Sequence, residues 1–170
     1  MRSAVWSPVV VVLMACAMGH AQEVSLQYRL KAAYLLNFTK FIEWPPDSAS
    51  GRFTMCVAGR NPFGEILTAT LRGETVGQRP IDVRVIVTPE RECDAVFVPK
   101  DVAPTPFLRT ARGAPALTVG EAPGFSTQGG IINFVLQEGT VRFQINPREA
   151  ERAGLRVSSH LLRLAQISDR

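Results

Sequence analysis

Two cysteines and one histidine are the side chains best suited to covalent or metal chemistry after the first 21 residues. Cys56 and Cys93 can pair or bind a metal, and His160 can act as a base or a ligand. If the cysteines pair, one histidine supplies too few ligands for a zinc site. Ser158 and Ser159 precede His160, but adjacent residues on a helix point in different directions, and helix capping explains serines there. We therefore expect no metal site, no cofactor and no catalytic histidine.

A glycine-bounded loop is the other candidate for chemistry. Gly59 to Gly64 lies between a predicted strand and a predicted helix, which is where phosphate-binding loops occur. Such a loop needs Lys and then Ser or Thr after its second glycine, whereas Glu65 and Ile66 follow here, and a carboxylate repels phosphate. The remaining carboxylates have no spacing that selects an acid–base pair. The sequence therefore favours a protein that is not an enzyme.

The first 21 residues have the pattern of a secretory signal peptide. A positive charge near the start is followed by the apolar run Val9–Met18 and by small residues before an expected cleavage after Ala21. This run has about half the length that a bilayer span requires. A lipoprotein anchored at Cys16 is the alternative, because the preceding residues loosely resemble a lipobox. We expect export and a mature chain of residues 22–170.

Export changes the expectation for the cysteines and for the charge. In an oxidising compartment Cys56 and Cys93 are expected to form a disulfide, the alternative being two separately buried thiols. The chain has a formal net charge of +4, and its basic residues are scattered without interleaved aromatic residues. We therefore expect no nucleic-acid partner.

Hydrophobic periodicity predicts the elements that hold these residues. Apolar residues at three- and four-residue steps indicate a helix from Glu23 to Ile42. Asn61-Pro62 should open a second helix of about ten residues, which ends at Leu71. The other predicted elements are strands 53–58, 81–87, 95–98 and 116–119, a hairpin of 131–136 with 141–145, short helices at 106–112 and 148–153, and a last helix capped by Ser158.

This succession predicts the fold class. Strands that alternate with helices imply parallel pairing, with the helices packed on the sheet. The hairpin around Glu138-Gly139 adds an antiparallel pair. We expect one α/β domain over residues 22–170, with a mixed, mostly parallel sheet flanked by helices and with a helix near each end of the chain.

Several segments occur in an order and spacing that one family shares. They are AYLLNFTKFIEWP (33–45), CVAGRNPFG (56–64), GQRPI (77–81), LTV (117–119), GGIINF (129–134), VRFQIN (141–146) and AGLRVSSHLLRLA (153–165), with Cys93 at the place of the family's partner cysteine. Together they resemble the YfiR family of periplasmic regulatory proteins, over nearly the whole chain after residue 21.

The resemblance implies regulation rather than catalysis. Members of the YfiR family bind the periplasmic portion of an inner-membrane diguanylate cyclase and hold it inactive, which lowers cyclic di-GMP and biofilm formation. An outer-membrane lipoprotein can sequester the inhibitor, and other relatives accompany a sensor kinase. Some relatives carry a second cysteine pair for redox control, which this chain lacks, so we expect the Cys56–Cys93 pair to be structural. Whether the chain forms a homodimer stays open.

A glycine-rich segment is the predicted contact site for a partner. From Gly124 to Phe134, glycines permit a close approach of backbones, and Phe125 offers an exposed aromatic anchor. The residues predicted to bind a partner are Phe125, Gly129, Gly130, Ile132 and Phe134. Phe125, Phe134 and Phe143 can instead belong to the core, and this is the interpretation that the sequence favours.

A second functional class competes with protein binding. The chain can instead be a periplasmic small-ligand binding protein that serves a sensor kinase or a transporter. In that case the cleft is expected at the carboxyl ends of the parallel strands, where α/β sheets usually bind ligands.

Overall fold

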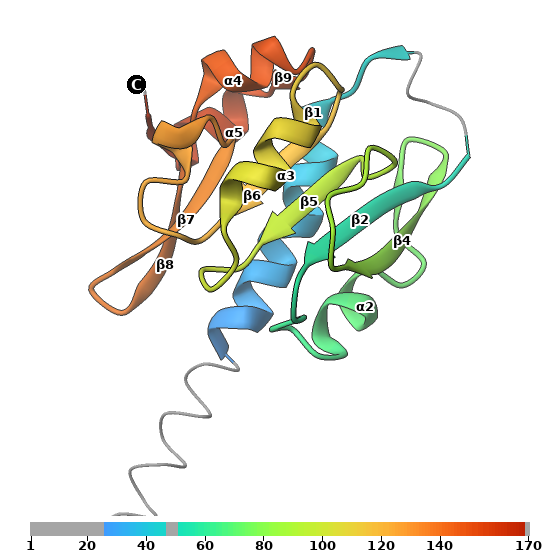
Figure 1. Cartoon of the computed structure of the whole chain (residues 1–170), viewed down its shortest axis with the longest axis horizontal. Helices are drawn as coiled ribbons and strands as arrows, with labels where there is room; N and C mark the ends of the chain where they lie inside the picture. The colour runs from blue at the N-terminus through green and yellow to red at the C-terminus, as the bar shows by residue number, and fades with distance from the viewer. Residues whose placement is uncertain (1–25, 47–50, 169–170) are drawn as a thin grey trace, which may run out of the picture.

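One sheet organises the molecule. The computed structural model describes residues 26–46 and 51–168, and the predicted signal peptide lies outside them. Within this part, eight strands form a sheet in the order β10-β8-β7-β6-β5-β2-β4-β3 (Figure 1). The central strands β4, β2, β5, β6 and β7 are parallel to one another, whereas β8 and β3 are antiparallel to their neighbours β7 and β4. The strands are β2 (Phe53–Ala58), β3 (Thr75–Val76), β4 (Arg79–Ile86), β5 (Ala95–Val98), β6 (Leu117–Gly120), β7 (Ile132–Gln137), β8 (Thr140–Ile145) and β10 (Gln166–Ile167).

Helices cover both faces of this sheet. A separate antiparallel pair joins β1 (Ile42–Glu43) to β9 (Arg156–Val157). The helices are the N-terminal helix over residues 26–41, α2 (Ile66–Leu71), α3 (Pro104–Ala111), the 3-10 turn η2 (Ser126–Gln128), α4 (Pro147–Arg152) and α5 (Ser159–Leu164). The predicted α/β domain, with its mostly parallel sheet and a helix near each end, is confirmed.

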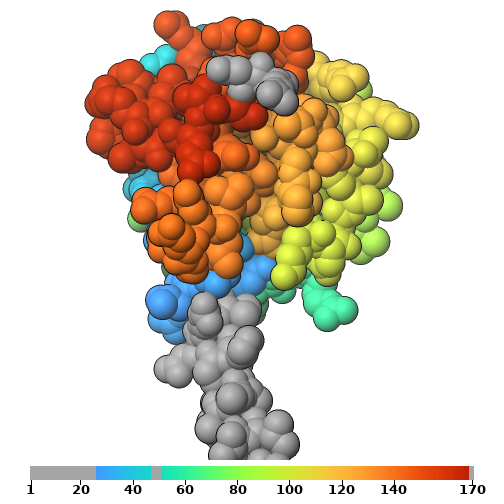
Figure 2. All heavy atoms as spheres, turned by 90° about the vertical axis from the view of Figure 1, so that its left-hand side faces the viewer, coloured from blue at the N-terminus to red at the C-terminus, as the bar shows by residue number. Residues whose placement is uncertain are grey.

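Alternation along the central strands builds two cores. On β2, Phe53, Met55 and Val57 face the larger core, where the N-terminal helix and α2 pack. Cys56 and Ala58 face the smaller core beneath α3. Figure 2 shows the β7–β8 hairpin, in orange, beside the start of the blue N-terminal helix, which packs on the larger core. Strand β2 is therefore covered on both of its faces, as strands of parallel sheets usually are.

Local signals were accurate where a side chain or a turn fixes the backbone. Glu138 and Gly139 have φ values of 50° and 74°, which is the positive-φ pair of a two-residue hairpin turn. Asn146 accepts a hydrogen bond from the backbone nitrogen of Glu149 at 3.2 Å and caps α4. Ser158 accepts one from Leu161 at 3.2 Å and caps α5. These start and turn predictions are confirmed.

Two predicted helices differ in length. The helix expected to open at Asn61-Pro62 begins only at Ile66, because Gly64 has φ +55° and Asn61 instead accepts a hydrogen bond from Phe63 at 2.9 Å in a local turn. The last helix ends at Leu164, and residues 166–167 become β10 beside β8. In the first case a turn, and in the second a strand pairing, includes residues that the apolar periodicity had assigned to a helix.

Candidate functional site

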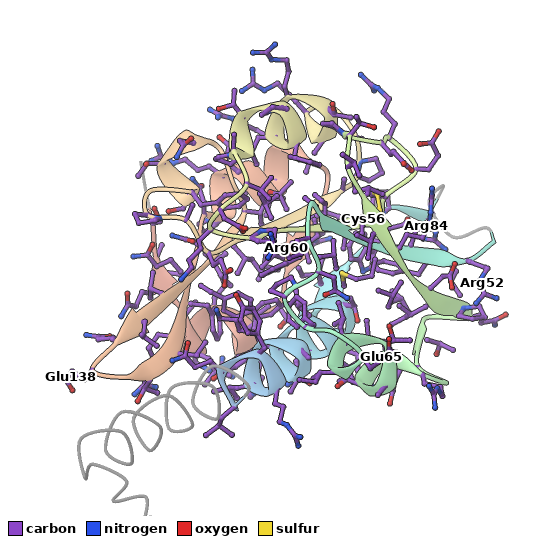
Figure 3. All side chains as sticks on the ribbon, turned by 60° about the horizontal axis from the view of Figure 1, so that its bottom comes forward. Arg52, Cys56, Arg60, Glu65, Arg84 and Glu138 are labelled. Atoms are coloured by element: carbon purple, nitrogen blue, oxygen red, sulfur yellow. A yellow bond between two sulfur atoms is a disulfide. The ribbon has the colours of Figure 1, made fainter. Side chains whose placement is uncertain are left out.

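The disulfide ties two neighbouring central strands together. Cys56 lies in β2 and Cys93 just before β5, with 5.8 Å between their Cα atoms. Both are buried in the core beneath α3, and Figure 3 shows the sulfur near Cys56 among packed side chains. The bond closes a 37-residue separation, which restricts the unfolded chain by about 4 kcal/mol on the loop-entropy model. The predicted pairing is confirmed, in the position of a structural clamp.

The glycine-rich segment folds inward around one aromatic ring. Phe125 is fully buried, and a Cβ built on Gly120 would lie 2.3 Å from its ring. A Cβ on Gly130 would lie 2.1 Å from the same ring on another side. Both positions therefore require glycine because Phe125 fills the space that a side chain would need. The close approach that the sequence predicted is made by this ring within the chain.

The residues predicted to contact a partner are therefore mostly interior. Phe125, Gly130, Ile132 and Phe134 are buried, and Gly129 is half-buried. Phe134 packs against Phe38 of the N-terminal helix, with ring centroids 5.7 Å apart. Phe125 is not an exposed anchor, and the interpretation that the phenylalanines belong to the core, which the sequence favoured, is confirmed. Their part in partner binding stays a prediction.

The amino ends of the parallel strands are joined by a buried ion pair. Arg79, at the start of β4, donates through Nη2 to Oδ2 of Asp94 at 2.8 Å and to the carbonyl of Arg52 at 2.6 Å. The same carboxylate oxygen accepts a hydrogen bond from the backbone nitrogen of Thr54 at 2.8 Å. Arg79 is only 8% exposed, and its guanidinium lies over the Phe53 ring. This amino-end clamp connects β4, β2 and the start of β5.

A cavity opens beside the amino-end clamp. It has a volume of about 370 Å³ and lies between α3, α4 and the starts of β6 and β7. Leu108 and Ile131 form part of its apolar wall, and Arg112, Glu149 and Arg152 supply its charges. Glu149 pairs with Arg152, whereas the Arg112 side chain has no ion pair within the described part of the chain. Gly129 of the predicted contact segment lines the same cavity.

Two shallower hollows extend this cavity along the same end of the sheet. One, of about 460 Å³, shares Gly113 and Arg152 with the first and reaches Pro45. The other, of about 260 Å³, shares Ala116 with the first and reaches Arg79 and Asp94. We refer to the three together as the amino-end groove. A ligand cleft was expected at the carboxyl ends, and these cavities lie at the opposite ends of the strands.

The N-terminal helix is tied to the carboxyl end of β6. Glu121 follows β6 there, and its side chain is 5% exposed. It pairs with Lys31, accepts a hydrogen bond from the Tyr28 hydroxyl at 2.9 Å and accepts another from the Lys100 backbone nitrogen at 3.2 Å. Burial first, and the Glu121 charge second, raise the pKa of Tyr28 above its ordinary value. We call Tyr28, Lys31 and Glu121 the carboxyl-end latch.

The sequence analysis did not predict either of the two buried ion pairs. Arg79 and Asp94 are 15 residues apart, and Lys31 and Glu121 are 90 apart, so no local spacing connects them. One signal was available, since Lys31 interrupts the apolar face of the predicted N-terminal helix and a buried lysine needs a carboxylate partner. The amino-end groove had no such signal, because its lining comes from segments that lie far apart in the sequence.

Over residues 26–46 and 51–168, no group of three or more His, Cys, Asp or Glu side chains is arranged to hold a metal ion. His160 packs against the Phe41 ring, with centroids 5.2 Å apart. Among the described helices, none is both long and apolar enough for a transmembrane span. The arrangement offers surfaces and a groove for binding.

Comparison with models of protein families gives a match over most of the chain. The family model described as YfiR/HmsC-like matches residues 28–166, which run from the N-terminal helix to the first residue of β10. No curated protein matches the chain. The match covers well over half of the sequence and includes the disulfide, the amino-end groove and the carboxyl-end latch. The chain therefore belongs to the YfiR/HmsC-like family.

Proposed function

We propose that this chain is a periplasmic regulator that binds the periplasmic portion of an inner-membrane diguanylate cyclase and holds the enzyme inactive. Binding lowers cyclic di-GMP and biofilm formation. The observation that carries the proposal is the family match over residues 28–166, since the YfiR/HmsC-like family is regulatory and non-catalytic. An outer-membrane lipoprotein that sequesters the chain is the proposed means of release.

The positions of the buried charged side chains support a binding role. The buried charges are engaged in the amino-end clamp and the carboxyl-end latch, where they join elements of the fold. A catalytic group needs access to a substrate, and these pairs have side chains that are at most 14% exposed. The chain thus acts through its surface, on an enzyme that it does not itself contain.

The amino-end groove is the proposed contact for the cyclase. It combines an apolar wall at Leu108 and Ile131 with the exposed charge of Arg112, which has no ion pair among the described residues. Protein interfaces favour such a site, because an apolar side chain can fill the cavity while arginine meets a carboxylate at the rim. We expect Arg112→Glu to weaken binding of the cyclase's periplasmic portion more than tenfold, because it places a carboxylate where the partner presents one. Arg142→Glu, at an exposed arginine of β8, is the control.

The whole-cell experiment is deletion of the gene followed by measurement of cyclic di-GMP. The level should rise in the deletion strain, and should not rise in a strain that also lacks the membrane cyclase that co-purifies with the chain. An unchanged level, together with failure to co-purify any membrane cyclase, would remove the cyclase from the proposal.

Small-ligand binding is a second candidate, and the cavity of about 370 Å³ favours it. Its volume lies within the range of about 300–1,000 Å³ that ligand sites occupy. Native mass spectrometry of the chain isolated from the periplasm tests this function. A co-purifying small molecule that is lost in Ile131→Trp, which fills the cavity, supports it. Identical masses for the native and the unfolded chain would contradict it.

A further inference from the structure

One hollow of the amino-end groove is lined by three arginines. It has a volume of about 260 Å³ and lies beside the disulfide. Arg52, Arg79 and Arg91 supply its positive charges, and Glu92 and Asp94 supply its negative ones. The rest of the lining is small and mostly apolar, and it consists of Cys93, Ala114, Pro115 and Ala116. The hollow is therefore a charged site with a short apolar wall.

Arg79 brings donors to this hollow that the fold leaves without acceptors. Its hydrogen bonds, to the Arg52 carbonyl and to Asp94, both come from Nη2. Nε is buried without an acceptor among the described residues, and Nη1 has no acceptor there either but remains in contact with solvent. Arg79 is 8% exposed and lines the hollow, so an acceptor that enters the hollow can meet Nη1. A bound oxygen there would satisfy a charged donor that the protein itself leaves unpaired.

The charges of the hollow favour a ligand with one negative charge. Asp94 accepts a hydrogen bond from Arg79 at 2.8 Å, so these two charges neutralise each other. Arg91 is exposed and has no ion pair within the described part of the chain. Arg52 has only an exposed ion pair, at 3.6 Å, with a residue outside the hollow, and Glu92 offsets one of these two arginines. The remaining positive charge matches a carboxylate better than a phosphate group, which carries about 1.5 to 2 negative charges at pH 7.

We propose that this hollow binds a free small carboxylate. Its carboxylate group accepts hydrogen bonds from Arg79 and Arg91, and its short apolar body lies against Ala114 and Pro115. Arginine suits this task because its planar guanidinium matches the geometry of a carboxylate. A volume of about 260 Å³ restricts the ligand to a few non-hydrogen atoms, since ligand sites for larger molecules occupy about 300–1,000 Å³. The site does not depend on the proposed cyclase partner.

Butyrate is the probe for this site. We expect it to shift the Nε–H signal of Arg79 in nitrogen-15 NMR spectra of the full chain isolated from the periplasm, since burial protects this proton from exchange with water. The shift should saturate with a dissociation constant of about 1 mM, which is reasonable for a ligand of so few atoms. Sodium chloride keeps the ionic strength constant, because salt screens exposed charges. Butyramide has the same shape without the charge and should cause no shift.

Two substitutions with opposite expected effects locate the ligand. Arg91→Ala removes a charged donor and should raise the dissociation constant of butyrate about tenfold. Glu92→Gln removes a like charge and should lower it about threefold. Both residues are exposed, so both variants are expected to fold. Arg109→Ala is the matched control, because it removes an exposed arginine of α3 that does not line the hollow, and it should leave the constant unchanged.

Four results would each overturn the proposal. The first is no saturable shift of the Arg79 signal up to about 100 times the expected dissociation constant. The others are an equal shift with butyramide, tighter binding of inorganic phosphate than of butyrate, and an Arg109→Ala variant that is weakened as much as Arg91→Ala. Because butyrate is titrated into the isolated chain, this outcome is separate from cyclic di-GMP in the deletion strain, which reports on the proposed function.

Discussion

The carboxyl and amino ends of the parallel strands each carry a buried ion pair, but the two pairs join different parts of the fold. At the carboxyl end of β6, Lys31 of the N-terminal helix pairs with Glu121, which ties the helix to the edge of the sheet where α/β proteins usually bind ligands. At the amino ends, Arg79 and Asp94 connect strands within the sheet and leave the groove beside them open. The carboxyl-end latch therefore joins a helix to the sheet, whereas the amino-end clamp joins strands to one another beside an open groove.

Breaking the carboxyl-end latch should have the largest effect. Glu121→Ala leaves Lys31 buried without a partner charge, which costs about 3–5 kcal/mol in the free energy of unfolding. Urea unfolding followed by circular dichroism measures the loss. The double variant Lys31→Met with Glu121→Leu should recover most of it, and a double variant as unstable as the single one would contradict the role of the unpaired charge.

Removing the disulfide should cost about 4 kcal/mol. Cys56→Ala with Cys93→Ala frees the unfolded chain over a 37-residue separation, and the cavity left in the core beneath α3 adds to the loss. The same urea experiment measures it. The double variant should still lower cyclic di-GMP wherever it remains folded, since we expect the bond to be structural. Loss of regulation in a fully folded variant would instead make the bond a switch.

Breaking the amino-end clamp should cost less, about 2–3 kcal/mol. Asp94→Ala removes hydrogen bonds to Arg79 and Thr54, but Arg79 keeps the Arg52 carbonyl as an acceptor. Asp82→Ala is the matched control, because its ion pair with Arg52 is exposed and contributes little. If both variants lose equal stability, burial does not distinguish the two pairs.

The smallest effect is expected from the Tyr28 hydroxyl. Tyr28→Phe removes one hydrogen bond to Glu121 and should cost about 1 kcal/mol at neutral pH. Folding raises the pKa of Tyr28, so its contribution is complete below pH 10 and falls as the pH rises above 10, where the unfolded chain loses the proton first. Urea unfolding at pH 7 and pH 10.5 should therefore show a smaller difference between Tyr28→Phe and the native chain at the higher pH. A constant difference would contradict the shift.

Sequence patterns predicted the elements whose signals are local. The β2 bounds, the hairpin turn at Glu138-Gly139 and the caps at Asn146 and Ser158 all follow from residues within a few positions of one another. The helix expected from Asn61 ends at Leu71 as predicted but begins only at Ile66, because Gly64 adopts a positive φ, and the presence of a glycine does not by itself predict that conformation.

The candidate site was less predictable, because its parts come from distant segments. An aromatic residue in a glycine-rich segment can be an exposed anchor, yet Gly120 and Gly130 leave room for the Phe125 ring in the interior. Only the folded chain brings these three residues together. The groove and both ion pairs have the same origin, since parallel strands place residues that are far apart in sequence at one edge of a sheet.

The most direct test of regulation from outside the cytoplasm is a complementation experiment in the deletion strain. The full chain should restore a low cyclic di-GMP level, whereas a chain that begins after Ala21 with a new start methionine should accumulate in the cytoplasm and leave the level high. A low level with the cytoplasmic form, or a high level with the exported one, would contradict the account.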